Sequence, residues 1–220
     1  MEDGKPLRGN EEWRSSKLLG SLLESKNDIT RRCMLGNIAF QKFKKVWSQS
    51  NVPIQKKLLV YEAQVVSVIM YNCSSWAAPK NYWHKLDVCH RNHLRSIMNI
   101  TWPKSMISNK TLYKRCNTAP LSEKAEFSRW KMLGHILRSD ECSPAQTALC
   151  FAIETSQRLT GRSGRHRISL LQTLKDDLEL RRIILDDYYD LIYLRELAND
   201  RLLWKKLFET KFDLKGHIIL

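Results

Sequence analysis

The sequence predicts a mainly α-helical protein, a small helical bundle with at most a short N-terminal strand. Glycine and proline are scarce, with 8 and 6 of 220 residues, so few positions interrupt regular structure. Apolar residues recur with the 3.6-residue period of a helix over several long stretches. They make up 43% of the chain, which is enough to form a buried core. At this length one domain, or two small helical ones, is expected.

Two long amphipathic helices are predicted in the first third of the chain. The first has an apolar stripe with spacings of 4, 3, 4, 3 and 4, which places one face toward a core: Ile29, Cys33, Gly36, Phe40, Phe43 and Trp47. Asn27 or Asp28 would cap it. Gly36 would permit a close helix crossing, since a helical Gly otherwise costs about 1 kcal/mol against Ala. Pro53 would start the second helix, whose apolar face holds Leu58, Tyr61, Val65, Ile69 and Cys73.

The remaining elements are predicted from the same period and from capping signals. Residues 17–24 would form a short strand or strap, and further helices are expected over 82–98, 108–116, 122–139, 144–157, 169–180, 188–196 and 198–208. Ser108, Ser143 and Ser169 stand where a helix cap is expected. The expected organisation is a flexible leader over 1–13, a helical hairpin over 14–80, a helical connector over 81–157, a basic loop over 158–168 and a C-terminal helical segment over 169–220.

The net charge of +14 indicates an acidic partner, of which nucleic acid is the commonest. The charge is unevenly placed along the chain. Residues 51–140 carry 14 basic and 5 acidic side chains, whereas residues 176–220 carry 8 and 10. We therefore expect the partner to meet the first 175 residues and the C-terminal segment to be structural.

Cationic side chains on the outward faces of successive helices are the candidate binding residues. One such face is usually only solvated, but several in succession favour phosphate binding, which positions a nucleic-acid backbone without reading its sequence. The predicted set is Arg31, Arg32, Lys42, Lys44, Lys45, Lys56, Lys57, Arg91, Arg95, Lys131 and Arg138, with Arg162, Arg165 and Arg167 in the basic loop. Arg129 is expected to be exposed as well.

No catalytic or metal-binding arrangement is predicted, and no cofactor. Phosphoryl transfer needs carboxylates placed to share two metal ions, and the acid pairs at 176–177 and 186–187 lie in helical context. Cys89, His90 and His93 lack the paired spacing of a structural zinc site. The tryptophans are expected in the core, with Trp102 the best candidate for stacking on a base.

Cysteine usage and the absence of targeting signals predict an intracellular protein, nuclear or cytoplasmic. Six scattered cysteines without C-x-x-C pairing favour reduced thiols. Residues 1–12 are polar and charged, unlike a signal peptide. The longest apolar run, 65–71, is too short to cross a membrane, so no membrane partner is expected.

A series of short motifs, in order from about residue 12 to 204, resembles LINE-type (non-LTR) retrotransposon reverse transcriptases. The motifs are Leu18-Leu19-Gly20-Ser21, Asp28-Ile29-x-Arg31-Arg32, Ala39-Phe40 with Trp47, Met70-Tyr71-Asn72-Cys73-Ser74-Ser75-Trp76, Leu94-Arg95-x-Ile97-x-Asn99-Ile100-x-Trp102-Pro103, Gly134-His135-Ile136-Leu137-Arg138, Gly161-Arg162-x-Gly164-Arg165-x-Arg167 and Leu197-Ala198-x-Asp200-Arg201-x-x-Trp204. In that family this region is the thumb and the C-terminal connector, which hold template and primer and do no chemistry.

The resemblance implies a thumb-like helical bundle followed by a helical connector, part of an RNA-directed DNA polymerase but without its catalytic palm. No Y-x-D-D motif occurs in the sequence, and neither does the zinc knuckle of some family members. Such a fragment would not be an enzyme. It would bind RNA or an RNA–DNA hybrid, and its partners could include the missing palm or another protein. The alternatives are a helical protein-interaction domain and a retroelement remnant without independent function.

Overall fold

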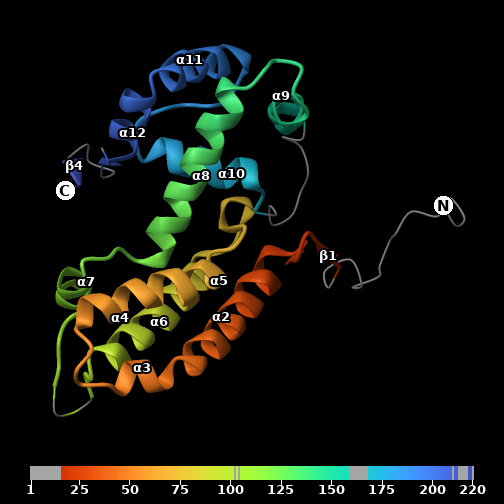
Figure 1. Ribbon diagram of the computed structural model, residues 1–220. Helices are drawn as coiled ribbons and strands as arrows, with labels where there is room; N and C mark the ends of the chain where they lie inside the picture. The colour runs from red at the N-terminus through yellow and green to blue at the C-terminus, as the bar shows by residue number, and fades with distance from the viewer. Residues whose placement is uncertain are drawn as a thin grey trace, which may run out of the picture. The chain divides into compact units, whose positions relative to one another are not determined.

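A computed structural model of the chain describes residues 16–101, 103, 105–158, 168–209, 211–212 and 218–219. Within these residues the protein is mainly helical, as predicted (Figure 1). They divide into two compact units. Unit 1 holds residues 16–72 and 78–122, and unit 2 holds 73–77 together with the described residues from 123 onward. The expected leader and residues 159–167 of the expected basic loop lie outside the described residues.

Unit 1 opens with a small antiparallel hairpin, which agrees with the short strand expected near the N-terminus. Strand β1, Lys17–Leu18, pairs with β2, Ser21–Leu22. The two turn residues, Leu19 and Gly20, both have positive φ, as a type I′ hairpin turn requires, and Gly is favoured there. A second hairpin, β3 Lys211–Phe212 with β4 Ile218–Ile219, was not predicted.

The helices of unit 1 agree with the predicted ones except at their ends. They are α2 Ser25–Lys42, α3 Lys44–Ser48, α4 Ile54–Tyr61, the π-helical turn η1 Glu62–Val66, α5 Ser67–Ile69, α6 Lys80–Ile97 and α7 Asn109–Cys116. The predicted caps Asn27 and Asp28 are wrong, since α2 begins after Glu24. Asp28 is buried in the first turn, where its carboxylate accepts a hydrogen bond from the Leu22 amide at 3.0 Å. It therefore ties the hairpin to α2.

The core of unit 1 forms where α2 packs against the η1–α5 segment and against α6. The predicted close crossing at Gly36 is confirmed. A Cβ atom added to Gly36 would lie 2.6 Å from Cδ1 of Ile69, so a larger residue would force the helices apart. The apolar faces predicted for the first two helices are buried, except for Phe43 and Leu58, which are half-buried. Cys73, the last residue of the second predicted face, is buried but lies beyond the end of α5, in unit 2.

The π-helical turn has a local cause in the spacing of buried residues. Tyr61, Val65 and Ile69 are all buried and follow one another at steps of four. In a regular α-helix of 3.6 residues per turn, repeated steps of four rotate around the axis. The wider π turn reduces this drift and keeps the three side chains toward the same core.

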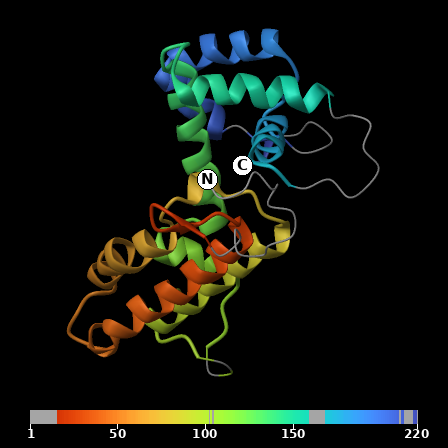
Figure 2. The same ribbon diagram turned by 90° about the vertical axis from the view of Figure 1, so that its right-hand side faces the viewer.

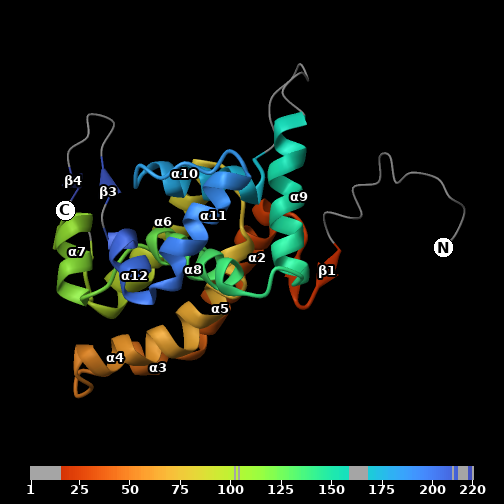
Figure 3. The same cartoon turned by 90° about the horizontal axis from the view of Figure 1, so that it is seen from above.

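Unit 2 is a helical cluster around one apolar core (Figures 2 and 3). Its elements are the 3-10 turn η2 Cys73–Ser75, most of α8 Leu121–Arg138, α9 Pro144–Arg158, α10 Leu170–Glu179, α11 Tyr188–Asn199 and α12 Arg201–Glu209. Each of the five long helices contributes buried residues to that core. The structure groups residues 78–122 with the N-terminal hairpin in unit 1, whereas the sequence placed most of them in the connector.

Two tryptophans join α8 to α12 in unit 2. The rings of Trp130 and Trp204 stack with centroids 4.2 Å apart. Each indole donates to the other residue's carbonyl, Trp130 Nε1 at 2.8 Å and Trp204 Nε1 at 3.1 Å. Gly134 makes room, since an added Cβ would lie 2.8 Å from Cδ1 of Trp204. The core role predicted for the tryptophans is confirmed for four of them, Trp47, Trp76, Trp130 and Trp204.

The three predicted serine caps are confirmed by their hydrogen bonds. Ser108 Oγ accepts from the Thr111 amide at 3.1 Å, and Ser169 Oγ accepts from the Gln172 amide at 3.1 Å. Ser143 Oγ accepts from the Gln146 amide at 3.3 Å. These caps are local in sequence, which explains why the sequence alone located them.

Candidate nucleic-acid interface

The positive charge of the chain is concentrated in unit 1. Residues 16–122 carry 17 Lys and Arg against 4 Asp and Glu, whereas residues 123–220 carry 17 against 15. Two of the four acids in unit 1 are occupied internally. Asp28 pairs with arginines of its own helix, and Asp87 accepts from the backbone amide and hydroxyl of Ser122 at 2.9 and 2.7 Å. These two acids therefore have partners within unit 1.

Four exposed lysines lie where the chain turns from α2 through α3 into α4 (Figure 1). We call this set the lysine corner: Lys42, Lys44, Lys45 and Lys56. Trp47 organises the turn, since its Nε1 donates to the Phe40 carbonyl at 2.8 Å and its ring stacks on Phe40. Lysine ammonium groups on flexible stems can neutralise phosphates without fixing a base sequence.

Two predicted phosphate contacts, Arg32 and Lys57, are corrected by the structure. They are only 7% and 4% exposed. Lys57 Nζ donates to the Trp47 carbonyl at 2.8 Å, which fastens the start of α4 to the end of α3. Arg32 donates to the Gly20 carbonyl at 2.7 Å and lies 4.4 Å from the ring centre of Tyr71. Burial and these internal partners keep both cations away from a phosphate.

Three other predicted cations of unit 1 are partly buried. Arg31 donates to the Gly20 carbonyl at 2.9 Å and so helps to hold the β1–β2 turn. Arg95 Nη2 donates to Asn109 Oδ1 at 2.6 Å, which links α6 to the start of α7. Arg91 is half-buried on α6. Their side chains reach solvent less freely than those of the lysine corner.

The remaining predicted contacts do not belong to unit 1. Lys131 and Arg138 lie in unit 2, where Lys131 is exposed beside the Phe127 ring and Arg138 donates to the Ala198 carbonyl at 2.8 Å. Arg162, Arg165 and Arg167 lie outside the described residues, as does the stacking candidate Trp102. Of the predicted set, the four residues of the lysine corner are thus exposed near one turn of the chain, and the others are buried, partly buried or in other segments.

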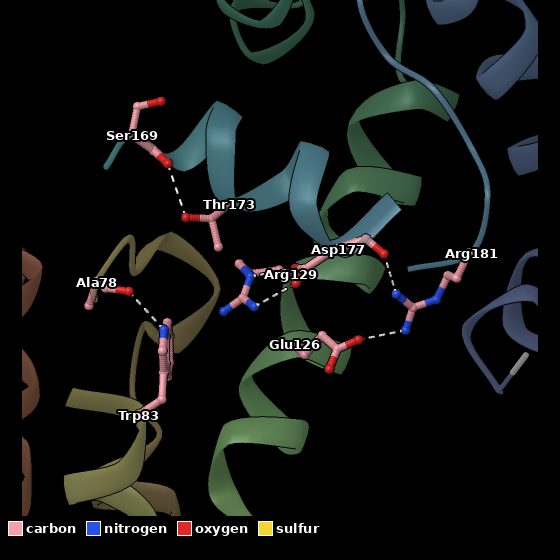
Figure 4. A network of polar contacts seen from close by, with 8 residues as sticks. All are labelled: Ala78, Trp83, Glu126, Arg129, Ser169, Thr173, Asp177 and Arg181. Atoms are coloured by element: carbon pink, nitrogen blue, oxygen red, sulfur yellow. Dashed lines mark hydrogen bonds and ion pairs between the residues drawn. The ribbon is translucent and has the colours of Figure 1, made fainter. Parts of the chain in front are cut away.

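The expectation that Arg129 is exposed is wrong. Arg129 is buried in unit 2, and its Nε and Nη2 atoms donate to the two carboxylate oxygens of Asp177 at 2.8 and 3.1 Å (Figure 4). Burial raises the pKa of Asp177, and the hydrogen bond from Arg129 opposes this rise. Arg181 also donates to Glu126, at 2.6 Å. These ions therefore bind one another inside the unit.

A buried polar cluster connects α2, α4 and α6 in unit 1. The Tyr61 hydroxyl lies 2.8 Å from His90 Nδ1 and 3.3 Å from His93 Nδ1. The other ring nitrogen of His93 lies 2.8 Å from Asn37 Oδ1. Burial lowers the pKa of His93 to about 4 and raises that of Tyr61 well above its ordinary value. His93 is therefore neutral at physiological pH.

Two thiols lie beside this cluster, Cys33 on α2 and Cys89 on α6. The hydrogen bond from Cys89 lowers the pKa of the Cys33 thiol, and the same bond raises that of Cys89. Cys89 Sγ also lies 3.4 Å from Asn37 Oδ1, a second acceptor for its one proton. Sequence reasoning considered Cys89, His90 and His93 but missed Tyr61 and Asn37, whose partners are at least 29 residues away. Among the described side chains, no group of three or more His, Cys, Asp or Glu is placed to hold a metal ion.

Several motifs that carry the family resemblance make internal contacts. In unit 1 the Gly20 carbonyl accepts from Arg31 and Arg32, while the Tyr71 hydroxyl donates to the Leu19 carbonyl at 2.8 Å. In unit 2 the motif around Gly134 packs against the one that ends at Trp204. These residues hold the elements of each unit together. In unit 1 the exposed lysines of the corner lie on these elements.

Comparison with protein-family models, with curated proteins and with solved structures finds no match to this chain. No helix within the described residues is long and apolar enough to cross a membrane.

Proposed function

We propose that unit 1 binds RNA or an RNA–DNA hybrid by its phosphates, with the lysine corner as the principal contact. The observation that carries this proposal is the excess of 17 basic over 4 acidic residues in 16–122, with four of those lysines exposed at one turn of the chain. Such contacts supply affinity through released counterions, and they are insensitive to sequence.

The role we propose is that of a non-catalytic holding region, akin to the thumb and connector of a LINE-type reverse transcriptase. The order of the family-like motifs along the chain supports this choice of nucleic acid. It is also supported by the way in which those motifs pack internally and leave the lysine corner exposed. Holding a backbone needs only a rigid support and mobile charges, and both are properties of unit 1.

The test reverses the charge of two lysines of the corner, with Lys44→Glu and Lys45→Glu combined in the full chain. We expect the affinity for single-stranded RNA and for an RNA–DNA hybrid to fall at least about tenfold in filter binding at low salt. The slope of log K against log salt should become shallower by about 1.4 to 1.8, because each phosphate contact contributes about 0.7 to 0.9.

A matched control reverses the same number of charges in unit 2, Arg201→Glu with Lys205→Glu, both exposed on α12. It should keep the affinity within about twofold of the wild type, since phosphate contacts act locally. Equal losses in both variants would show that only net charge matters. An unchanged affinity of the Lys44/Lys45 variant would exclude the lysine corner as the contact.

A further inference from the structure

Helix α11 of unit 2 is apolar on two opposite faces. Leu191, Leu194 and Ala198 are buried in the core. The opposite face holds Tyr189 and Tyr193, which are 80% and 56% exposed, and the flank between it and the recess described next holds Tyr188 and Ile192, which are exposed as well. A helix on the surface of a soluble protein normally carries polar residues on its outer face. The outer face of α11 therefore has the composition of a surface that is covered by a partner.

A recess of about 210 Å³ lies next to this face and is lined by residues of α9, of α11 and of the turn before α9. Its lining residues are Glu141, Gln146, Cys150, Tyr188, Leu191, Ile192 and Arg195. Phe151, the neighbour of Cys150 on α9, is exposed as well. The recess and the exposed side chains together give a surface bounded by two helices, which suits a helical ligand better than a flat one.

The charge around this surface has the opposite sign to that of unit 1. The turn before α11 and the helix itself, residues 186–196, carry 4 Asp and Glu against 1 Arg. Glu196 is exposed on the outer face itself. Arg195, the cation at its edge, is already paired with Glu141. A negative border repels nucleic acid and attracts a basic ligand.

We propose that the outer face of α11, with the recess beside α9, binds a basic amphipathic helix of a partner protein. Apolar residues spaced i, i+4 and i+7 on that helix meet the tyrosines and Ile192, and its lysines or arginines meet Glu196 and the acids before α11. Tyrosine suits such a contact because it offers a large apolar area with few rotatable bonds. A second copy of the same face is disfavoured, since pairing would bring its acids together.

The test measures fluorescence anisotropy of two synthetic 18-residue helical peptides with the full chain, in the absence of nucleic acid. Both peptides carry leucine at the i, i+4 and i+7 positions, and the remaining positions are mostly lysine in one and mostly glutamate in the other. The lysine peptide should bind and the glutamate peptide should not. Because the whole chain is positive, unspecific attraction works against this result.

Two variants of the chain locate the site. Tyr189→Ser with Tyr193→Ser should weaken binding of the lysine peptide at least tenfold. The control, Met34→Ser with Ile38→Ser, removes an apolar pair with the same spacing on α2, where the two side chains are 61% and 55% exposed. This control should leave binding of the lysine peptide unchanged. Glu196→Lys should weaken binding of the lysine peptide and strengthen binding of the glutamate peptide.

Equal binding of both peptides, or no effect of the tyrosine changes, would overturn the proposal. Self-association of the chain that the tyrosine changes abolish, measured by sedimentation, would overturn it in favour of a second copy. The tyrosine and Glu196 variants leave the lysine corner intact, so their effects on binding of the lysine peptide test this proposal independently of nucleic-acid binding.

Discussion

Neighbouring lysines on α4 illustrate how a residue's role depends on what lies within its reach. Lys56 is exposed, whereas Lys57 is buried with its Nζ on the Trp47 carbonyl. A buried ammonium group is tolerated only when hydrogen bonds replace its water, and the carbonyl supplies one. Its aliphatic stem can pack against apolar neighbours at the same time. Lys57 is thus part of the framework, and Lys56 is available to a ligand.

His93 should make the protein less stable in mild acid. Its pKa is about 4 in the folded protein, against an ordinary value of 6.5. Between these pH values the unfolded chain binds a proton that the folded protein does not, so stability falls as the pH is lowered. The loss is about 1.4 kcal/mol per pH unit in this window, and stability above pH 6.5 is unaffected.

Urea unfolding at pH 7 and pH 5 checks this prediction. The cluster around His93 also contains Tyr61, His90, Asn37 and Cys89, and the nearby Lys85 adds a positive charge. The variant His93→Gln should be less stable than the wild type at pH 7 but should lose less stability between the two pH values. The same loss in both proteins would assign the pH dependence to other groups.

At the scale of elements, the crossing of α2 with α5 decides the geometry of unit 1. Gly36→Ala should destabilise the protein even though alanine is the better helix former by about 1 kcal/mol. The new methyl group would meet the buried Ile69 side chain, and such overpacking costs about 1 to 3 kcal/mol.

Chemical denaturation of Gly36→Ala, of Ile69→Ala and of the double variant tests the crossing. The double variant should be more stable than the sum of the single effects, because the smaller residue at 69 leaves room for the methyl group. Additive effects would show that the two residues do not compete for space.

The elements themselves could largely be predicted from sequence. The caps at Ser108, Ser143 and Ser169 and the stripes of α2 and α6 depend on residues a few positions apart. Asp28 was misplaced because its carboxylate binds an amide six residues earlier, in the hairpin, and not the first turn of its own helix. The π-helical turn was missed, since steps of four fit a helical period closely enough to hide it.

At the scale of the molecule, the uneven charge of the two units predicts how binding depends on salt. If the lysine corner makes four phosphate contacts, the slope of log K against log salt should be about −3 to −4. Lys131→Gln, a change at a predicted contact that lies in unit 2, should leave this slope unchanged, whereas the loss of one phosphate contact would make it shallower by about 0.7 to 0.9.

Titration of the RNA affinity between 50 and 300 mM salt, with wild type and Lys131→Gln side by side, measures both slopes. A slope much steeper than −4, or a shallower one after the Lys131 change, would show that unit 2 takes part in binding. Lys131 is an informative choice because its side chain is exposed and its Nζ lies 4.9 Å from the centre of the Phe127 ring.

The sequence by itself determined the helical class, most element positions and the basic excess of the first half, because period, capping and composition are local or additive properties. Only the tertiary structure decided which cations face solvent. Arg32, Lys57 and Arg129 find acceptors in distant segments, at Gly20, Trp47 and Asp177, and no helical pattern reveals such partners. The exposed face of α11 is likewise a tertiary result, since a helix with two apolar faces shows which one is free only when its neighbours have been placed.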